Sequence, residues 1–433
     1  MKASVTQLKN TVDIFTIGAQ SGILWSHNNE ILAGFGETKR IEYNDSNLFT
    51  DSLDYLKQID LENPYPRKIY PVAFTALPFT RSENATVLIP KYTLQQFDDG
   101  SQYLIAIDST DPLQFLKEFM ASSDTESSFH SDLANQSTHA AETEANLIEC
   151  NVGIVRDSES SFKISSTLSE KDWKSKVVGE ALKRIDANDI KKVVLSRQMH
   201  INSDQEFDLE LVMNRLKRNY SKAILFSIDG FVGASPEMLV SKNNEDVTAH
   251  PLAGTEPRNS NPELDNVARE SLLKSTKDQW EHQITIDWFL DSLMSYCSYV
   301  DAEPEPTIVE LANVFHLGTK VHGKLSSPDV SICDLVNVLH PTPAVAGDPQ
   351  KTALKIIEEL EPNSRGRYAG PVGWFDASGD GSFAVGIRSA EILGPSAIVN
   401  AGVGVVKDSD PEKEFIETKA KSEAMLTGLG IKI

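Results

Sequence analysis

The stretch DPEKEFIETKAKSEAML, residues 410–426, lies almost at the end of the chain and decides how the rest is interpreted. Asp410 is a favourable helix N-cap. Pro411 suits the first helical position because its missing N–H would have no partner there. Glycines at 428 and 430 are typical of a helix end. The stretch therefore predicts a helix that begins after Asp410 and ends at Gly428 and Gly430.

One face of this helix carries two carboxylates and an ammonium group. Residues three and four apart share a helix face, so Glu414, Glu417 and Lys421 line up. A charged stripe on a helix is most often a solvated row of ion pairs. The alternative is that the three groups point inward at a ligand, and the stretch alone favours the solvated stripe.

Length and charge limit the class of protein. The chain has 433 residues and a net charge of −22, which disfavours binding to nucleic acids and to anionic membranes. Its three cysteines are widely spaced without a CxxC pair. The N-terminus has no apolar signal segment, and no apolar run is long enough to span a bilayer. These features predict a cytoplasmic protein without nucleic-acid or membrane partners.

Composition and hydrophobic pattern divide the chain into three parts. Residues 1–120 alternate short apolar runs with turns and predict antiparallel strands, including the run DIFTIGAQSGILWSH at 13–27. Residues 121–148 are polar and Ser-rich, as in a linker or exposed loop. Residues 149–433 form the third part, which is predicted to contain both strands and helices.

Strands and helices come in blocks within residues 149–433. Residues 169–189 predict an amphipathic helix, and a long helix is predicted from about Leu264 to Tyr299. Near the C-terminus, 367–376, 382–393 and 397–406 predict a three-strand meander before the last helix. Blocks of this kind favour an α+β class over a doubly wound fold.

Familiar catalytic motifs are absent from the sequence. GFGETK lacks the third glycine of a dinucleotide fingerprint, and no GxxxxGK[ST] or HExxH occurs. GASPE lacks the last glycine of a nucleophile elbow. The nine histidines show no spacing typical of metal ligands. A nucleotide enzyme, a zinc enzyme and a serine hydrolase are therefore all disfavoured.

Nine separated stretches together resemble one family. In chain order they are KKVVLSR, GASPEMLV, HPLAGTEPR, WEHQITID, VFHLGTKVHG, LHPTPAVAGDP, RGRYAGPVGWFD, FAVGIRSAEI and NAGVGVVKDSDPEKEFIETKAK. They are similar to the chorismate-utilising enzymes, which include isochorismate, salicylate, anthranilate and aminodeoxychorismate synthases. The resemblance covers residues 170–426 strongly and the first part weakly, and it implies that residues 149–433 are the chorismate-binding catalytic region. It implies large antiparallel sheets packed as a sandwich with helices outside.

The resemblance implies a magnesium ion that bridges the enzyme and the ring carboxylate of chorismate. By motif, the carboxylates around it are Glu281, Glu414 and Glu417. Oxygen ligands from a few carboxylates, with water and substrate, are what Mg²⁺ prefers. Lys421, one turn further along, is expected to face a substrate carboxylate.

The resemblance also implies a set of substrate-binding residues. Arg388 suits a bidentate carboxylate clamp. Tyr368 and the backbone at Gly402 match positions that bind the pyruvyl carboxylate in the family. Further pocket residues expected near the substrate are Ala253, Gly254, Thr255, His316 and Ala344.

Three positions set the expected reaction. Lys192 resembles the general base that activates water in isochorismate and salicylate synthases, although Lys191 beside it leaves the choice of lysine open. Glu237 resembles the general acid that protonates the departing C4 hydroxyl. Ala253 stands where aminodeoxychorismate synthases carry a nucleophilic lysine. The resemblance therefore implies a reversible, Mg²⁺-dependent isochorismate synthase that needs no amidotransferase subunit.

Other interpretations of the sequence stay open. A salicylate synthase would share the first step and then eliminate pyruvate. An ammonia-dependent synthase would need a glutamine amidotransferase partner, and a non-catalytic binding protein would need neither an acid nor a base. LHPTPAVAG is closer to isochorismate synthases. We expect a monomer that supplies siderophore synthesis by way of 2,3-dihydroxybenzoate rather than menaquinone synthesis.

Overall fold

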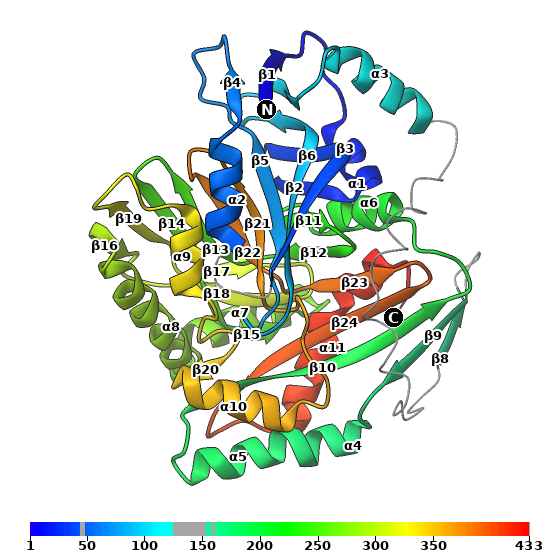
Figure 1. Cartoon of the computed structure of the whole chain (residues 1–433). Coiled ribbons are helices and arrows are strands. Elements are labelled where there is room, and N and C mark those ends of the chain that lie inside the picture. The colour runs from blue at the N-terminus through cyan, green and yellow to red at the C-terminus, as the bar shows by residue number, and fades with distance from the viewer. Residues whose placement is uncertain (44–47, 124–152, 157–160, 433) are drawn as a thin grey trace.

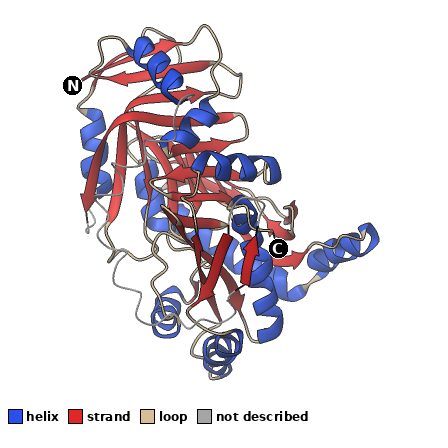
Figure 2. Cartoon of the chain, turned by 90° about the vertical axis from the view of Figure 1, so that its right-hand side faces the viewer, coloured by secondary structure: helices blue, strands red, loops and turns tan. Residues whose placement is uncertain are grey.

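The computed structural model describes residues 1–43, 48–123, 153–156 and 161–432. Strands occupy the middle of the molecule and most helices lie outside them (Figures 1 and 2). From residue 124 onward, the predicted polar linker 121–148 lies outside the described residues. Residues 121–123 belong to the end of helix α3.

Helices and strands follow one another in blocks along the chain. The helices are α1 (Ile14–Ser21), α2 (Leu48–Lys57), α3 (Pro112–Ser123), α4 (Glu170–Asp172), the π-helical η3 (Trp173–Val178), α5 (Gly179–Asp186), α6 (Leu209–Asn219), α7 (Pro262–Lys274), α8 (Thr276–Met294), α9 (Ile332–Leu339), α10 (Gln350–Leu360) and α11 (Pro411–Gly428).

The strands range in length from two residues in β20 to 14 in β3. They are β1 (Lys2–Gln7), β2 (Ile23–His27), β3 (Glu30–Tyr43), β4 (Asp60–Glu62), β5 (Val72–Ala76), β6 (Ala85–Gln96), β7 (Gln102–Ile107), β8 (Gly153–Arg156), β9 (Ser161–Ser166), β10 (Lys192–Ser203), β11 (Ile224–Ile228), β12 (Phe231–Ser235), β13 (Met238–Asn243), β14 (Asp246–His250), β15 (Leu252–Pro257), β16 (Cys297–Ala302), β17 (Thr307–Glu310), β18 (Val314–Gly318), β19 (Val321–Leu325), β20 (Gly347–Asp348), β21 (Pro371–Asp376), β22 (Gly381–Val385), β23 (Ser389–Leu393) and β24 (Ser396–Val405).

Backbone pairing joins the strands of the described residues into a 21-stranded network, with a separate three-stranded sheet in the order β15-β18-β17. β1 pairs with β4 in parallel, whereas the pairs around the site are antiparallel. β2 pairs with β11, and β5 pairs with β21, so the N-terminal strands share a sheet with the catalytic region. The predicted α+β class, with large antiparallel sheets and helices outside, is confirmed.

The long pair β10–β24 runs through the lower half of the molecule (Figure 1). Val194 lies opposite Gly404, and Ser196 lies opposite Gly402. Alternation along β10 puts Lys192, Val194 and Ser196 on one face of the pair. Glycines on the partner strand leave that face open to long side chains from neighbouring elements.

Helix α11 packs on β24 and on α6. Asp410 accepts hydrogen bonds from the backbone N–H groups of Glu412 and Lys413, and Pro411 occupies the first turn, as the sequence predicts. Phe415 and Met425 are buried. The helix continues through Gly428, and Gly430 follows with a φ of 86°.

The stretch from Leu264 to Tyr299, predicted to be helical, is interrupted once, and its helical structure ends before Tyr299. The structure has two helices, α7 and α8, separated at Ser275, and the end of the stretch belongs to strand β16. Ser275 accepts a hydrogen bond from the backbone N–H of Asp278 and so begins a new helix. The Ser-x-x-Asp spacing was a readable start signal.

The predicted three-strand meander is wrong. Residues 382–393 form two strands, β22 and β23, which separate at Arg388, a residue with a φ of 52°. After the break, β23 pairs with β12, whereas β22 pairs with β13. The left-handed backbone at Arg388 costs energy in a non-glycine residue, and the break turns its side chain out of the strand pattern.

The run at 13–27 was predicted as strand, but its first part is helix α1. Asp13 caps it by accepting from the backbone N–H of Thr16. The apolar pattern was too short to separate strand from helix. Among the described residues, no helix is long and apolar enough to cross a membrane. Cys297 and Cys333 are buried and free.

Candidate active site

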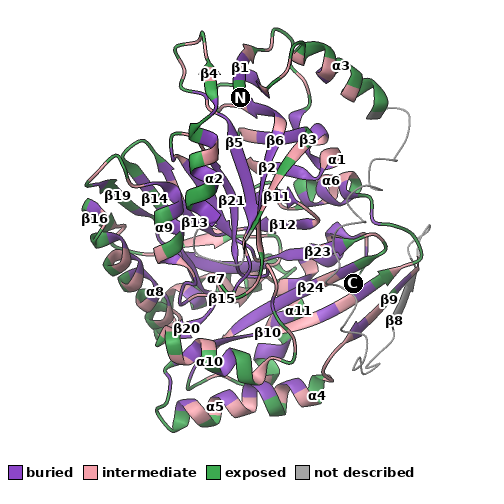
Figure 3. Cartoon of the chain, in the orientation of Figure 1, coloured by how far each residue is buried: buried purple, intermediate pink, exposed green. Residues whose placement is uncertain are grey.

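The charged face of α11 points inward. The side chain of Glu414 is only 6% exposed, and that of Lys421 is 12% exposed. Lys421 Nζ donates to the backbone oxygen of Gly402 at 3.0 Å and lies 2.6 Å from Glu417 Oε1. The colouring by burial in Figure 3 shows α11 against the buried strand β24. The solvated-stripe interpretation is therefore wrong for these three groups.

Lys192 lies inside the same cluster. It is 1% exposed, and its Nζ is 2.7 Å from Glu281 Oε1, on helix α8. Lys191 points outward, with a 66% exposed side chain that pairs with Asp348. The geometry thus brings Lys192, and not its neighbour, to the predicted site.

Gly404 makes room for this ion pair. A Cβ atom at Gly404 would lie 2.9 Å from Glu281 Oε1 and 3.1 Å from Lys192 Cε. Any side chain there would force the pair to shift. Burial acts to raise the pKa of Glu281, but the adjacent Lys192 ammonium more than offsets it, so the pKa of Glu281 is lowered. Glu281 is therefore a carboxylate at neutral pH.

Glu237 follows β12 and is fully buried. Burial raises the pKa of its carboxyl group from 4.5 to about 7, although a hydrogen bond with the Leu252 backbone and the charges of Arg388, Lys192 and Lys421 oppose the rise. Its Oε1 is a buried atom without a hydrogen-bond partner among the described residues. A carboxyl group that holds its proton near neutral pH suits a general acid.

Arg388 and His316 form a buried pair. Arg388 Nη2 donates to His316 Nε2 at 2.9 Å. Burial and the Arg388 charge hold the pKa of His316 well below its usual range, so the imidazole is neutral. Its Nδ1 then carries the proton and donates to the Gly254 oxygen at 3.1 Å, with Thr255 Oγ1 at the same distance. Arg388 Nε is buried without a partner in the described chain, which leaves one donor for an anionic ligand.

Tyr368 and Gly402 meet beside this pair. The tyrosine is buried, and its hydroxyl would lie 2.9 Å from a Cβ atom at Gly402. Ala253 is buried on β15. Ala344 lies in the turn before β20 and is tied to the cluster only indirectly, because Ala346 accepts a hydrogen bond from Val194 N–H. Contacts thus link Arg388 to His316, Gly254 and Thr255, and Tyr368 to Gly402 and Lys421, whereas Ala253 and Ala344 are placed only by their positions in the chain.

Two acidic residues at the site were missed. Asp278 lies one helical turn before Glu281, and burial together with the Glu281 and Glu417 carboxylates raises its pKa. Burial and Asp278 likewise raise the pKa of Glu256 on β15. The three-residue spacing of Asp278 and Glu281 could have revealed the first. Glu256 carried no spacing signal, since a sheet brings it to the helix.

The expected magnesium site depends on the carboxylates of Glu281, Glu414 and Glu417. Among the described residues, no three His, Cys, Asp or Glu side chains are grouped closely enough to hold a metal ion. Each predicted glutamate instead faces a lysine: Glu281 faces Lys192, Glu417 faces Lys421, and Lys277 lies 4.0 Å from Glu414.

The electrostatics nevertheless fit a hard dication. Burial and the neighbouring Glu417 carboxylate raise the pKa of Glu414 to about 7. A cation bound near Glu414 and Glu417 would offset both the burial and the charge repulsion that raise this pKa. The available donors are carboxylate oxygens, which Mg²⁺ prefers.

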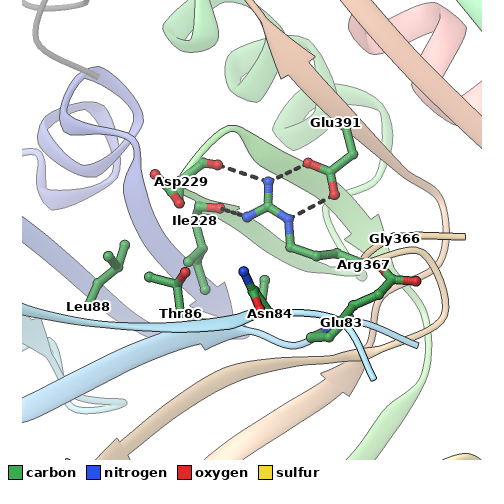
Figure 4. A pocket seen from close by; sticks show the side chains of 11 residues that line it. Glu83, Asn84, Thr86, Leu88, Ile228, Asp229, Gly366, Arg367 and Glu391 are labelled. Atoms are coloured by element: carbon green, nitrogen blue, oxygen red, sulfur yellow. Dashed lines mark hydrogen bonds and ion pairs between the residues drawn. The ribbon is translucent and has the colours of Figure 1, made fainter. Parts of the chain in front are cut away.

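A separate cavity of about 180 Å³ lies between the N-terminal strands and the catalytic region. In Figure 4, Arg367 in the cavity lining binds both oxygens of Glu391 and the backbone oxygens of Ile228 and Asp229. Its walls contain none of the predicted site residues. Because the Arg367 guanidinium group already makes four hydrogen bonds to protein oxygens, this cavity is best explained as a polar junction between strands.

Comparison with known proteins gives the class. A family model described as "Chorismate binding enzyme" matches residues 4–430. The chain therefore belongs to the chorismate-binding enzymes, and the predicted resemblance is confirmed.

Its relatives include isochorismate synthases. The chain is 35% identical to isochorismate synthase DhbC of Bacillus subtilis over 281 residues, which are 62% of this chain and 70% of the relative. It is 38% identical to isochorismate synthase MenF of the same organism over 267 residues, 61% of this chain and 56% of the relative. Isochorismate synthases are isomerases, and a chain of this family is an enzyme.

Solved structures extend the similarity over the whole fold. A crystal structure of DhbC from Bacillus anthracis superposes with a TM-score of 0.75 at 26% identity and covers 96% of this chain and 97% of that one. Anthranilate synthase component I from Streptococcus pneumoniae superposes with a TM-score of 0.68 at 20% identity, over 92% of each chain. The second similarity concerns the fold alone.

Replacing Gly404 with Ala tests the packing of the site. The added Cβ should separate Lys192 from Glu281, and chorismate turnover should fall at least about tenfold, since small misplacements of reacting groups cost that much. The measurement is steady-state turnover, with thermal unfolding to show that the variant is folded. Gly179→Ala, in helix α5, is the matched control and should leave turnover unchanged. Full activity in folded Gly404→Ala would show that the ion pair tolerates displacement.

Proposed function

We propose that the protein is an isochorismate synthase that converts chorismate reversibly into isochorismate with Mg²⁺. The observation that carries the proposal is the buried Lys192, which lies in one cluster with Glu237, Arg388 and the carboxylates of α8 and α11. The two relatives from Bacillus subtilis are isochorismate synthases, in agreement with a base that activates water.

Substrate binding is assigned to the positive groups of the cluster. Arg388 offers its unpartnered Nε to the pyruvyl carboxylate, and Tyr368 can donate to the same group. His316 is neutral and accepts from Arg388, so it fixes the guanidinium without competing for the anion. Glu281, Glu414 and Glu417 would hold Mg²⁺, which when bound neutralises and holds the ring carboxylate.

The reaction needs one base and one acid. Lys192 acts as the neutral amine: its ammonium proton passes to solvent before the turnover, and its Nζ then takes a proton from water as the water oxygen forms a bond to C2 of chorismate. The ring double bonds shift, and the bond from C4 to its hydroxyl breaks. Glu237 gives its proton to the departing hydroxyl, which leaves as water. Because substrate and product are isomers with similar bonding, the same groups with exchanged roles run the reverse reaction.

The alternatives differ in product or nucleophile. A salicylate synthase would go on to release pyruvate, and an ammonia-dependent synthase would form an aminated product with a partner subunit. Lys192 favours water as the nucleophile. Product chromatography after incubation with chorismate and Mg²⁺ separates the three, since the proposal predicts an isochorismate–chorismate mixture that is reached from either side.

Replacing Lys192 with Ala should abolish isomerisation, by at least about a thousandfold, because the general base is lost. Magnesium-dependent binding of chorismate, measured by calorimetry, should persist. Lys191→Ala is the matched control, since this neighbouring lysine is exposed, and it should keep full activity. Unchanged turnover in Lys192→Ala would reject the mechanism.

Replacing Glu237 with Gln should remove turnover without lowering stability at pH 8. The raised pKa means that wild-type stability from this carboxyl is complete below about pH 4.5 and is lost as the pH rises through about 7. Glutamine does not ionise, so the variant should gain up to about 2 kcal/mol in unfolding free energy at pH 8 and less at pH 5. Chemical denaturation at both values checks this. A variant that is less stable at pH 8 would show that the carboxylate is well solvated.

We further propose that the isochorismate serves siderophore synthesis by way of 2,3-dihydroxybenzoate. The vibriobactin-specific isochorismate synthase of Vibrio cholerae is 36% identical over 249 residues, although MenF proteins are similarly related. Deletion of the gene should stop growth under iron limitation, and added 2,3-dihydroxybenzoate should restore it. Restoration only by menaquinone would assign the other pathway.

A further inference from the structure

The edge of β10 that faces away from β24 is paired at both ends and open between them. Strand β20 pairs with Lys192 and Val193, and β9 pairs from Met199 onward. Over the described residues, no strand covers positions 194–198 on that edge. Backbone N–H and C=O groups buried in such a gap need other partners.

Side chains and a loop supply those partners. Val194 N–H donates to the Ala346 oxygen at 2.9 Å, and Val194 O accepts from Arg365 Nη2 at 2.7 Å. Ser196 N–H donates to Glu361 Oε1 at 2.7 Å. The indole N–H of Trp173 donates to the Ser196 oxygen at 3.3 Å. The backbone N–H and C=O groups of Val194 and Ser196 therefore all have hydrogen-bond partners.

Glu361 and Arg365 form the centre of this arrangement. Their side chains are 4% and 2% exposed and are joined by two hydrogen bonds, Nη2 to Oε1 at 2.5 Å and Nε to Oε2 at 2.9 Å. Ser196 Oγ also donates to Glu361 Oε2 at 3.0 Å. Such a buried ion pair is often no more stabilising than apolar packing, so its geometry points to a different use.

The pair is connected to three parts of the site. On β10 it holds Val194 and Ser196, on the strand face that carries Lys192. Arg365 Nη1 donates to the Val345 oxygen at 2.8 Å, in the turn that contains Ala344. The Arg365 backbone oxygen accepts from Tyr368 N–H at 3.1 Å.

We propose that Glu361 and Arg365 are positioning residues for isomerisation: they replace a missing strand beside β10 and fix Lys192 relative to Tyr368 and the 341–346 turn. The inference rests on the proposed function. Neither residue touches the substrate. They act through the backbone of β10, so their loss should slow the water attack more than it weakens binding.

The test compares Arg365→Lys and Ser196→Ala with wild type. Arg365→Lys keeps the charge but loses the planar fork that binds Glu361 and two backbone oxygens at once. We expect kcat to fall about tenfold to a hundredfold, with the KM for chorismate within about twofold. Titration with an equilibrated chorismate–isochorismate mixture should still give one bound ligand per chain, which shows that the lower kcat is not a loss of active molecules.

Arg184→Lys is the matched control. Arg184 pairs with Glu359, which lies near the end of α10, two residues before Glu361. Unlike the side chains of Glu361 and Arg365, both of these side chains are partly exposed, at 31% and 53%. This variant should keep kcat and KM. Ser196→Ala removes a single hydrogen bond to Glu361 and is expected to fold in any case. Its kcat should fall about threefold. This variant therefore tests the positioning role even if Arg365→Lys does not fold.

The positioning role and the proposed function can be rejected separately. An active wild type together with unchanged kcat in folded Arg365→Lys, or in Ser196→Ala, rejects the positioning role alone. A rise in KM at constant kcat also rejects it, because the pair would then serve binding. Wild-type protein that leaves chorismate unchanged rejects the proposed function itself.

Discussion

The arrangement depends on one close contact, the buried ion pair of Lys192 and Glu281 over Gly404. A lysine that is 1% exposed needs a compensating charge, and helix α8 supplies it only because the partner strand carries no side chain at that point. The pairing of β10 with β24, the start of α8 at Ser275 and the approach of α11 all serve this contact. β10 supplies Lys192, α8 supplies Glu281 and α11 supplies Glu414, Glu417 and Lys421, while β24 leaves room for the ion pair at Gly404.

The site holds a balance of opposing charges. Glu237 keeps its proton near neutral pH because burial outweighs three nearby cations. Glu281 is ionised because a lysine outweighs the same effect. Two carboxyl groups in one cluster therefore differ in pKa, so Glu237 can donate a proton near neutral pH while Glu281 stays ionised beside Lys192. A neutral His316 then orients Arg388 without adding charge.

Local rules predicted the ends of α11, the strand at Lys192 and the overall class. The identity of the site came from ordered motifs, since Glu281, Arg388 and Glu414 each have an ordinary structural explanation taken singly. Sequence patterns did not reveal the features that depend on contacts between distant segments of the chain. The break at Arg388 interrupts a run that looks like one continuous strand. Glu361 and Arg365 resemble a surface helix pair until the fold buries them beside β10. Glu256 reaches the site only through the three-stranded sheet.

The most direct test of the account follows the oxygen atoms. Purified protein is incubated with chorismate and Mg²⁺ in water labelled with heavy oxygen, and the isochorismate is analysed by mass spectrometry. If Lys192 activates water for attack at C2, isochorismate formed in a single turnover carries one solvent oxygen in its C2 hydroxyl. Unlabelled isochorismate would mean that the hydroxyl moves within the substrate, and it would contradict the roles given to Lys192 and Glu237.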